Sequence, residues 1–389
     1  MAVSGERLDR WRERRTRRLQ ERGLMRAQSV RGGPPAYYVA DEVLVRDEHR
    51  DLAHDVLNRQ GHAPRDTVAD ATLVRGFRRL RARDLDVTTA ARTIRERAAG
   101  EGDDRPAATP NHIFLSTLFE HGGPFGPPVP APAAELTNSP KGPRVGVTVI
   151  DTGIWRDSPL PARYYRVDDA DIESDVDVDD DGVIDGDVGH ANFIAGVIAQ
   201  RTAKADIRVL RVLDTFGICT EAELVTALGR VDDDATLVNL SLGGFTVDDQ
   251  APLVLADALD DLLASGDRLV VAAAGNDGQR GRPFWPAAFA TGDDRVLAVA
   301  AHDSSDLCEW SNAGDWVTLA APGADLTSTF VRHPEFGTGW AQWSGTSFAT
   351  PYVVAALAEK LAAGASAAAA RAAVLADASD TYAGYPGLP

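Results

Sequence analysis

The chain has 389 residues with an ordinary globular composition, 44% hydrophobic and 25% charged, which is enough material for two or three domains. Its net charge of −18 argues against a nucleic-acid partner, because binding to a phosphate backbone requires a basic surface. No segment reaches the ~18 consecutive apolar residues of a membrane span, so we expect no membrane partner.

The first 36 residues are predicted to form a charged lead, rich in arginine and glutamate, that is either helical or disordered. This lead contains no apolar stretch of signal-peptide length. We therefore expect the protein to be cytoplasmic or to be exported by a non-standard route. The chain has only two cysteines, Cys219 and Cys308, so its fold does not depend on a disulfide framework.

Residues 37–118 show a mixed pattern of strands and helices, which predicts a small α+β domain. A strand over 37–47 is followed by a helix over 48–61, a weaker strand near 71–80, a second helix over 88–100 and a last strand over 110–115. Two halves of this kind suggest a split βαβ arrangement. Proline and glycine dominate residues 119–143, so this segment is predicted to be a linker or an arm over the surface.

Residues 144–389 are predicted to form one large α/β domain. Six apolar runs typical of buried strands are separated by stretches that include amphipathic helices; the runs are RVGVTVID, IRVLRVL, ATLVNLSLGG, RLVVAAAGN, RVLAVAA and WVTLAAPG. Such a pattern indicates a mostly parallel sheet with helices on both faces. Active sites of such sheets collect beyond the carboxyl ends of the strands, where Asp151, Ser241 and Asn276 stand.

Four residues of this domain are candidates for catalysis. Ser347 begins a long apolar helix, and its hydroxyl requires a neighbouring base to become a nucleophile. Pro351, four residues on, lacks the N–H that would pair with the Ser347 carbonyl. His190 begins the helix HANFIAGVIAQ, while Asp151 and Asn276 follow buried strands. Taken singly, each candidate has an ordinary structural explanation, such as a helix cap, a core histidine or a turn residue.

Taken together, the four motifs are specific. In chain order they are DTG at Asp151, GHxxxxAG at His190, AAGN at Asn276 and SGTSxATP at Ser347, and they resemble the subtilisin-like serine proteases, or subtilases. The order Asp, His, Ser is that of subtilisin. The resemblance covers roughly residues 141–375. It implies a subtilisin-like fold, a serine endopeptidase acting on proteins or peptides, and chemistry that requires no cofactor.

The resemblance also assigns the catalytic roles. Ser347 attacks the scissile carbonyl, His190 takes and returns its proton, and Asp151 holds the imidazole and stabilises its charged form. The Asn276 amide and the Ser347 backbone N–H donate to the oxyanion. Where the family has His-Gly-Thr-His, this chain has HANF from His190, and we expect the extra methyl of Ala191 to affect the rate more than the role.

Substrate-binding residues follow from the same resemblance. Six residues are expected to line the two edges of the cleft: Ser241, Leu242 and Gly243 on one, and Phe216, Gly217 and Ile218 on the other. A peptide between these edges would be bound as an added β-strand. The alternative is that both segments are ordinary loops.

An acidic run over residues 175–187, DVDVDDDGVIDGD, precedes His190 and has the spacing of the beginning of an EF-hand calcium loop. Four residues are candidate calcium ligands: Asp177, Asp179, Asp181 and Asp185. The bidentate glutamate that would end such a loop is absent, since Val188 stands there. A structural calcium ion and a merely solvated acidic loop are therefore both open.

The domain over residues 37–118 looks like the inhibitory propeptide that precedes many subtilase catalytic domains. Residues 1–140 carry 23 arginines, no lysine and 20 acidic residues, while the rest has a net charge of −21, and opposite potentials favour docking. We therefore expect a zymogen whose N-terminal domain inhibits it intramolecularly, with its last strand in the cleft and a cleavage site near Leu118–Glu120. An unrelated regulatory domain is the alternative.

Two other functions remain open for the whole chain. One is a catalytically weak or silent subtilisin-fold binding or regulatory protein, which a missing triad residue would favour, although none is missing. The other is a calcium-responsive interaction module, in which calcium would change partner binding without proteolysis.

Overall fold

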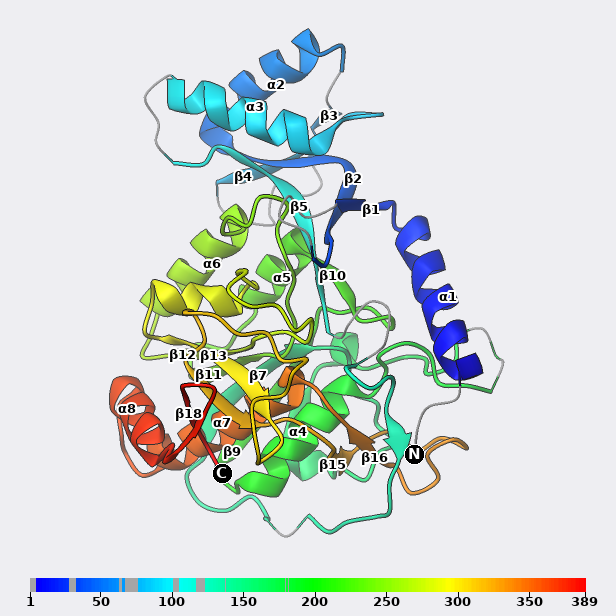
Figure 1. Cartoon of the computed structure of the whole chain (residues 1–389), viewed down its shortest axis with the longest axis vertical. Helices are drawn as coiled ribbons and strands as arrows, with labels where there is room; N and C mark the ends of the chain where they lie inside the picture. Colours follow the sequence, from blue (N-terminus) through cyan, green and yellow to red (C-terminus); the bar gives the residue numbers. More distant parts are fainter. Residues whose placement is uncertain are drawn as a thin grey trace.

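The computed structural model describes residues 5–27, 33–62, 65–66, 76–100, 105–116, 123–136, 138–178, 180 and 182–389. A small part lies at one end of the molecule, and the strand β5 (Ala108–Leu115) runs from it into a much larger part (Figure 1). The helix α1 (Gly5–Glu21) lies along the side of the larger part. Within these described ranges, no helix combines the length and the apolar character that crossing a membrane requires.

The small part is an antiparallel sheet with two helices. It contains β1 (Leu24–Ala27), β2 (Ala36–Arg46), α2 (Arg50–Arg59), β3 (Arg65–Asp66), β4 (Phe77–Arg81), α3 (Val87–Gly100) and β5, and a 3₁₀ turn, η1 (Asp47–His49), precedes α2. The sheet order is β10-β5-β2-β4-β3, in which β10 (Ile218–Thr220) comes from the larger part, and β1 also pairs with β2. Because β4 is antiparallel to both β2 and β3, it lies between two parallel strands. This is the predicted split βαβ arrangement.

The larger part is built on a nine-stranded sheet of order β17-β18-β14-β13-β12-β11-β7-β9-β8, in which only the β17–β18 pairing is antiparallel. Its strands are β7 (Val145–Asp151), β8 (Tyr165–Val167), β9 (Ala205–Arg211), β11 (Ala235–Leu240), β12 (Leu269–Ala273), β13 (Val296–His302), β14 (Leu319–Pro322), β17 (Asp380–Tyr382) and β18 (Tyr385–Gly387). The six predicted apolar runs are β7, β9 and β11 to β14. The predicted α/β class, with a small α+β part in front, is confirmed.

Helices cover both faces of this sheet because its strands are apolar on both sides. In β12, Leu269 and Val271 join one core, whereas Val270 and Ala272 join the other. The first core lies under α4 (His190–Arg201), α7 (Thr346–Ala362) and α8 (Ala367–Asp377), and the second under α5 (Glu221–Leu228) and α6 (Leu253–Ala264). This packing fixes α4 and α7, which carry two of the predicted catalytic residues.

Several smaller elements complete the larger part. A three-stranded sheet joins β15 (Leu326–Thr329), β16 (Trp340–Trp343) and β6 (Val129–Pro130), so part of the predicted linker is held on the surface as a strand. The remaining elements are β10 (Ile218–Thr220) and the 3₁₀ turns η3 (Ala162–Tyr164), η4 (Asp169–Asp171) and η5 (Ala287–Thr291). Both cysteines are free and buried. The domain limits at residues 36, 118 and 143 stay predictions.

Candidate active site

A carboxylate and an imidazole meet where β7 ends and α4 begins. Asp151, the last residue of β7, and His190, the first of α4, are both fully buried. Asp151 Oδ1 lies 2.7 Å from His190 Nδ1. It also accepts from the Thr152 backbone N–H at 2.8 Å. Because an ionised carboxylate only accepts, this contact places the ring proton on Nδ1 and leaves Nε2 able to accept one.

Aromatic side chains hold the imidazole in place. The rings of Trp343 and Phe348 lie 5.4 Å and 5.2 Å from the ring of His190. His190 Nε2 is buried and has no hydrogen-bond partner within the described part of the chain. The site therefore contains a buried imidazole whose Nε2 atom can accept a proton.

Ser347 is the second residue of α7, and its carbonyl group has an unusual partner. Pro351 lies inside α7 and cannot donate the usual intrahelical hydrogen bond. The Ser241 hydroxyl, at the carboxyl end of β11, donates to the Ser347 carbonyl at 2.7 Å instead. The sequence predicted the missing intrahelical bond, and the structure shows what replaces it.

The Ser347 hydroxyl faces two backbone carbonyls in this structure. Its Oγ atom lies 3.1 Å from the carbonyl oxygen of Ser241 and 3.1 Å from that of Ser116. Ser116 directly follows β5, the strand that enters from the small part of the molecule. The hydroxyl of the predicted nucleophile therefore contacts a peptide segment of its own chain.

Asn276 lies beside Ser347 with a fixed amide orientation. Its Oδ1 atom accepts from the Thr346 backbone N–H at 2.8 Å and from the Thr346 hydroxyl at 3.0 Å. Because the oxygen is held by two donors, the Nδ2 group is directed away from Thr346. An amide held in this way can donate to an oxygen that becomes negatively charged at Ser347.

The strand β5 occupies the predicted substrate cleft between its two edges. On one edge, Leu115 and Gly243 exchange two backbone hydrogen bonds of 2.9 Å. On the other, Leu115 is opposite Ile218 of β10, and the Ser116 N–H donates to the Gly217 carbonyl at 3.1 Å. Leu242 and Ile218 are buried, and Phe216 is partly buried beside Ile218. The predicted Leu118–Glu120 cleavage site lies outside the described residues.

Each edge of the cleft has a glycine position with no room for a side chain. A Cβ atom at Gly243 would lie 2.2 Å from the Phe284 ring, and one at Gly217 would lie 2.0 Å from Ser116 Oγ. Gly217 also has a φ of +70°, which disfavours any side chain. Gly217 therefore leaves room for the inserted segment, whereas Gly243 leaves room for the Phe284 ring that packs against its own edge.

A cavity of about 460 Å³ opens next to Ser347 and Asn276. Apolar residues, including Ala273 and Phe284, form much of its lining, and Asp277 also lines it. Burial raises the pKa of Asp277 to about 6. The cavity can accept an apolar side chain, and the charge of Asp277 changes near neutral pH.

The four predicted calcium ligands are only partly described. Asp177 accepts from the Gly182 backbone N–H at 2.7 Å, and Asp185 accepts from the Val178 N–H at 2.7 Å while it also pairs with Arg14 of α1. Asp179 and Asp181 lie outside the described residues. No group of three or more His, Cys, Asp or Glu in the described ranges could hold a metal ion. The calcium site stays a prediction.

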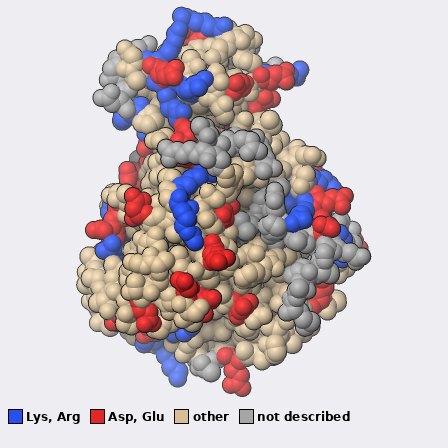
Figure 2. All heavy atoms as spheres, in the orientation of Figure 1, with Lys and Arg blue, Asp and Glu red and all other residues tan. Residues whose placement is uncertain are grey.

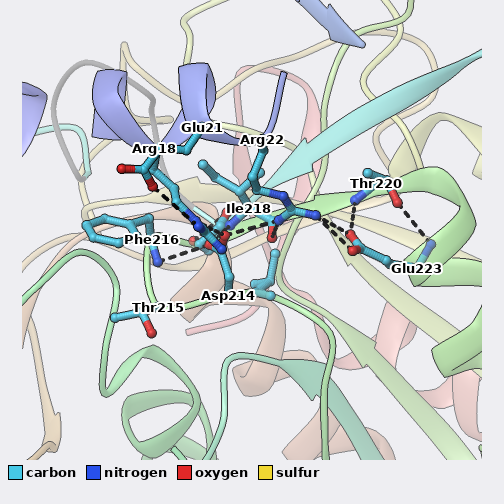
Figure 3. Close-up of polar contacts among 12 residues, drawn as sticks. Arg18, Glu21, Arg22, Asp214, Thr215, Phe216, Ile218, Thr220 and Glu223 are labelled. Carbon is cyan, nitrogen blue, oxygen red and sulfur yellow. Dashed lines mark hydrogen bonds and ion pairs between the residues drawn. The ribbon is translucent and has the colours of Figure 1, made fainter. Parts of the chain in front are cut away.

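Arg18 of helix α1 and Arg22, which follows the end of that helix, contact one edge of the cleft. Arg18 Nε lies 3.0 Å from Asp214 Oδ2, and Arg22 Nη1 lies 3.1 Å from the same oxygen (Figure 3). Arg22 also donates to both carboxylate oxygens of Glu223 at 2.8 Å and to the Ile218 carbonyl at 3.1 Å. The sequence indicated that this lead is helical or disordered but did not predict where it packs.

Two supporting residues were also missed, although their motifs were noted. Thr152, in the DTG motif, accepts from the Ala191 backbone N–H at 3.0 Å and so ties α4 to Asp151. Thr346, in the SGTS motif, orients Asn276. The departure from the family pattern is accommodated as well, since Ala191 is fully buried and Asn192 makes two 2.9 Å hydrogen bonds to the Trp155 backbone.

Comparisons with known proteins identify the family of the chain. The sequence pattern of the Subtilase family matches residues 142–388. The chain is 31% identical over 266 residues to the thermophilic serine proteinase of Bacillus sp. (strain AK1), which covers 63% of this chain and 60% of that protein. It is 28% identical over 284 residues to subtilisin E of Bacillus subtilis (strain 168), which covers 70% of each.

Among solved structures, a cold adapted subtilisin-like serine proteinase is similar, with a TM-score of 0.50 and 25% identity over 67% of this chain and 92% of that one. The matched region spans 60% of the length of the thermophilic proteinase, which is less than two thirds, and 70% of the length of subtilisin E. A family match over 142–388 covers well over half of the 389 residues. The chain therefore belongs to the subtilase family of subtilisin-like serine proteases.

Proposed function

We propose that the protein is a serine endopeptidase with Asp151, His190 and Ser347 as its catalytic triad. The observation that carries the proposal is the buried 2.7 Å contact between Asp151 and His190. The His190 ring packs 5.2 Å from that of Phe348, the residue after Ser347, and the Ser347 hydroxyl contacts a peptide carbonyl. His190 Nε2 accepts the Ser347 proton as Oγ attacks the scissile carbonyl, then returns it to the leaving amine. Asp151 stabilises the imidazolium that forms between these steps.

The developing oxyanion is stabilised by two N–H donors. Thr346 holds the oxygen of the Asn276 amide, which leaves the amide nitrogen to donate, and the Ser347 backbone N–H is the second donor. The substrate backbone pairs with Gly243 on one edge and with Gly217 and Ile218 on the other, as β5 does in this structure. Peptides and proteins are the substrates that such strand pairing fits.

The N-terminal part holds this enzyme inactive in our proposal. The main support is β5, which fills the cleft and presents the Ser116 carbonyl to Ser347. Charged contacts outside the cleft also support it. Arg46 pairs with Asp257 at 2.6 Å, and Arg95 with Asp248 at 2.8 Å.

These contacts join an arginine-rich N-terminal part to an acidic body. Acidic side chains are spread over the larger part on the face that Figure 2 shows. The predicted attraction between the two parts therefore has specific partners. Calcium, bound by the acidic run over residues 175–187, would act as a structural ion and take no part in the chemistry.

A fluorophosphonate probe tests the proposed function directly. Protein that has been incubated until its activity is constant should be labelled at Ser347 and should hydrolyse casein, and both signals should vanish in Ser347→Ala. Asp294→Asn, an exposed change far in sequence from the triad, is the control and should keep both. Absence of labelling and hydrolysis in the folded wild type, with and without mild removal of its N-terminal part, would instead support a silent binding protein.

A further inference from the structure

Asp187 is a buried carboxylate near the catalytic centre that the proposed mechanism does not use. It lies three residues before His190, has no exposed surface, and donates its backbone N–H to the Thr215 carbonyl at 2.9 Å. Its Oδ2 atom accepts a hydrogen bond from the Ser116 hydroxyl. The carbonyl of the same Ser116 contacts Ser347. A peptide side chain next to the reacting serine therefore points at Asp187.

The opposite edge of the cleft leaves room for this contact. A Cβ atom at Gly217 would lie 2.1 Å from Asp187 Oδ2 and 2.0 Å from Ser116 Oγ, so any side chain there would separate the two. Ser116 Oγ also lies 3.4 Å from the Gly217 carbonyl. The side chain of Ser116 is thus enclosed between Asp187 and the glycine edge.

A cation from α1 lies against the same carboxylate. Arg15 Nη2 is 3.5 Å from Asp187 Oδ2, and the Arg15 side chain is only 1% exposed. Burial lowers the pKa of Arg15, and among the charges that oppose this effect Asp187 is the largest. A buried carboxylate without compensating groups is strongly unfavourable, and Arg15 supplies positive charge here.

Arg15 and Ser116 both belong to the N-terminal part, which must leave the cleft before a substrate can enter. Asp187 then loses the guanidinium and the hydroxyl together. A serine in a substrate would replace only the hydroxyl, whereas an arginine or lysine would also replace the charge. The acidic body, with its net charge of −21 over residues 141–389, attracts such peptides as well.

We propose that Asp187 is a specificity-determining residue that selects arginine or lysine at the substrate position occupied here by Ser116. This inference rests on the proposed function and names its substrate class: peptides with a basic residue on the amino side of the scissile bond. In the full chain, the Arg15 guanidinium lies beside Asp187 where the basic side chain of such a substrate would bind.

The test uses the decapeptide HIFLSTLFEH, the sequence of residues 112–121, with its serine replaced by arginine or by citrulline. Citrulline has nearly the shape of arginine without its charge. Full-length protein is incubated until its activity is constant, and kcat/KM is measured for each peptide, with the cut bond identified by mass spectrometry. We expect the arginine peptide to be hydrolysed at least about tenfold better, as charge-assisted hydrogen bonds suggest.

Asp187→Asn should reduce this arginine-to-citrulline ratio to near one, while Asp294→Asn, which removes an equal charge from an exposed site, should keep it. If Asp187→Asn does not fold, the ratio in the wild type still decides. Equal rates for the two peptides in the wild type would overturn the inference and leave the proposed function standing. Failure to hydrolyse any peptide, together with no fluorophosphonate labelling, would overturn both.

Discussion

The contacts of α1 with the cleft edge predict how firmly the N-terminal part is held. The change is Arg18→Gln together with Arg22→Gln, made in full-length Ser347→Ala so that the chain is not cut. Arg22 is 17% exposed and hydrogen bonds to Asp214, Glu223 and Ile218, whereas Arg18 is 36% exposed and contacts Asp214. Burial alone would lower the pKa of Arg22, but Glu223 and Asp214 raise it above its usual value.

The expected magnitude follows from these exposures. Exposed ion pairs contribute about 0.2–1 kcal/mol, and hydrogen bonds to charged groups up to about 3 kcal/mol. Arg18 falls at the low end of this range and Arg22 near its middle, so the double variant should lose about 2 kcal/mol of docking free energy. That loss raises the equilibrium constant for release of the N-terminal part from the cleft by about thirtyfold.

Hydrogen exchange of the Leu115 and Gly243 amides measures this opening, because these amides pair across the cleft. They should exchange about thirtyfold faster in the double variant, and the difference should shrink in 1 M NaCl. Arg17→Gln, which removes the same charge from an ion pair within α1, is the control. Unchanged exchange at both amides, with the helix content preserved in circular dichroism, would refute the reasoning.

Three further predictions concern the site. Asn276→Ala should lower kcat about a hundredfold with little change in KM, because its amide donates only to charge that develops during the reaction; a change confined to KM would contradict this role. Calcium should raise the melting temperature of the wild type relative to chelator and should not do so after Asp179→Asn with Asp181→Asn; equal responses would mean that the run is merely acidic. The pKa of Asp277 is raised to about 6 by burial, so the folded state retains a proton between about pH 4 and 6 that the unfolded state releases, and stability falls as the pH rises through that window. The free energy of unfolding of Asp277→Asn, measured by urea titration, should therefore exceed that of the wild type by about 1 kcal/mol at pH 7.5. At pH 3.5 the two proteins should have equal free energies of unfolding.

Much of the larger part could be predicted because its information is local. The apolar runs that end at Asp151 and Asn276 are strands in the structure. Because these strands are parallel, both residues stand at the carboxyl ends of the sheet's strands. Pro351 also indicated that the Ser347 carbonyl has no intrahelical hydrogen bond and must pair with another donor. In each case a few neighbouring residues carry the signal.

The rest depends on contacts between distant residues. Arg22 and Asp214 are 192 positions apart, and a charge total of +3 against −21 does not say which arginine meets which carboxylate. Asp187 ends the acidic run, which was interpreted as a calcium loop. Its contact with Ser116, 71 positions away, could not be predicted from that run. The strands β17 and β18, three residues each, form only by pairing at the edge of a sheet that already exists.

The hydroxyl of Ser241 joins two functions in one rigid unit. It accepts from Asn239 at 2.9 Å and donates to the Ser347 carbonyl, so it ties the carboxyl end of β11 to the first turn of α7. The strand end that leads to the peptide-binding edge is therefore hydrogen bonded directly to the helix that carries the attacking oxygen. We therefore expect the carboxyl end of β11 and the first turn of α7 to move together, so that a bound peptide carbonyl stays within reach of the serine oxygen.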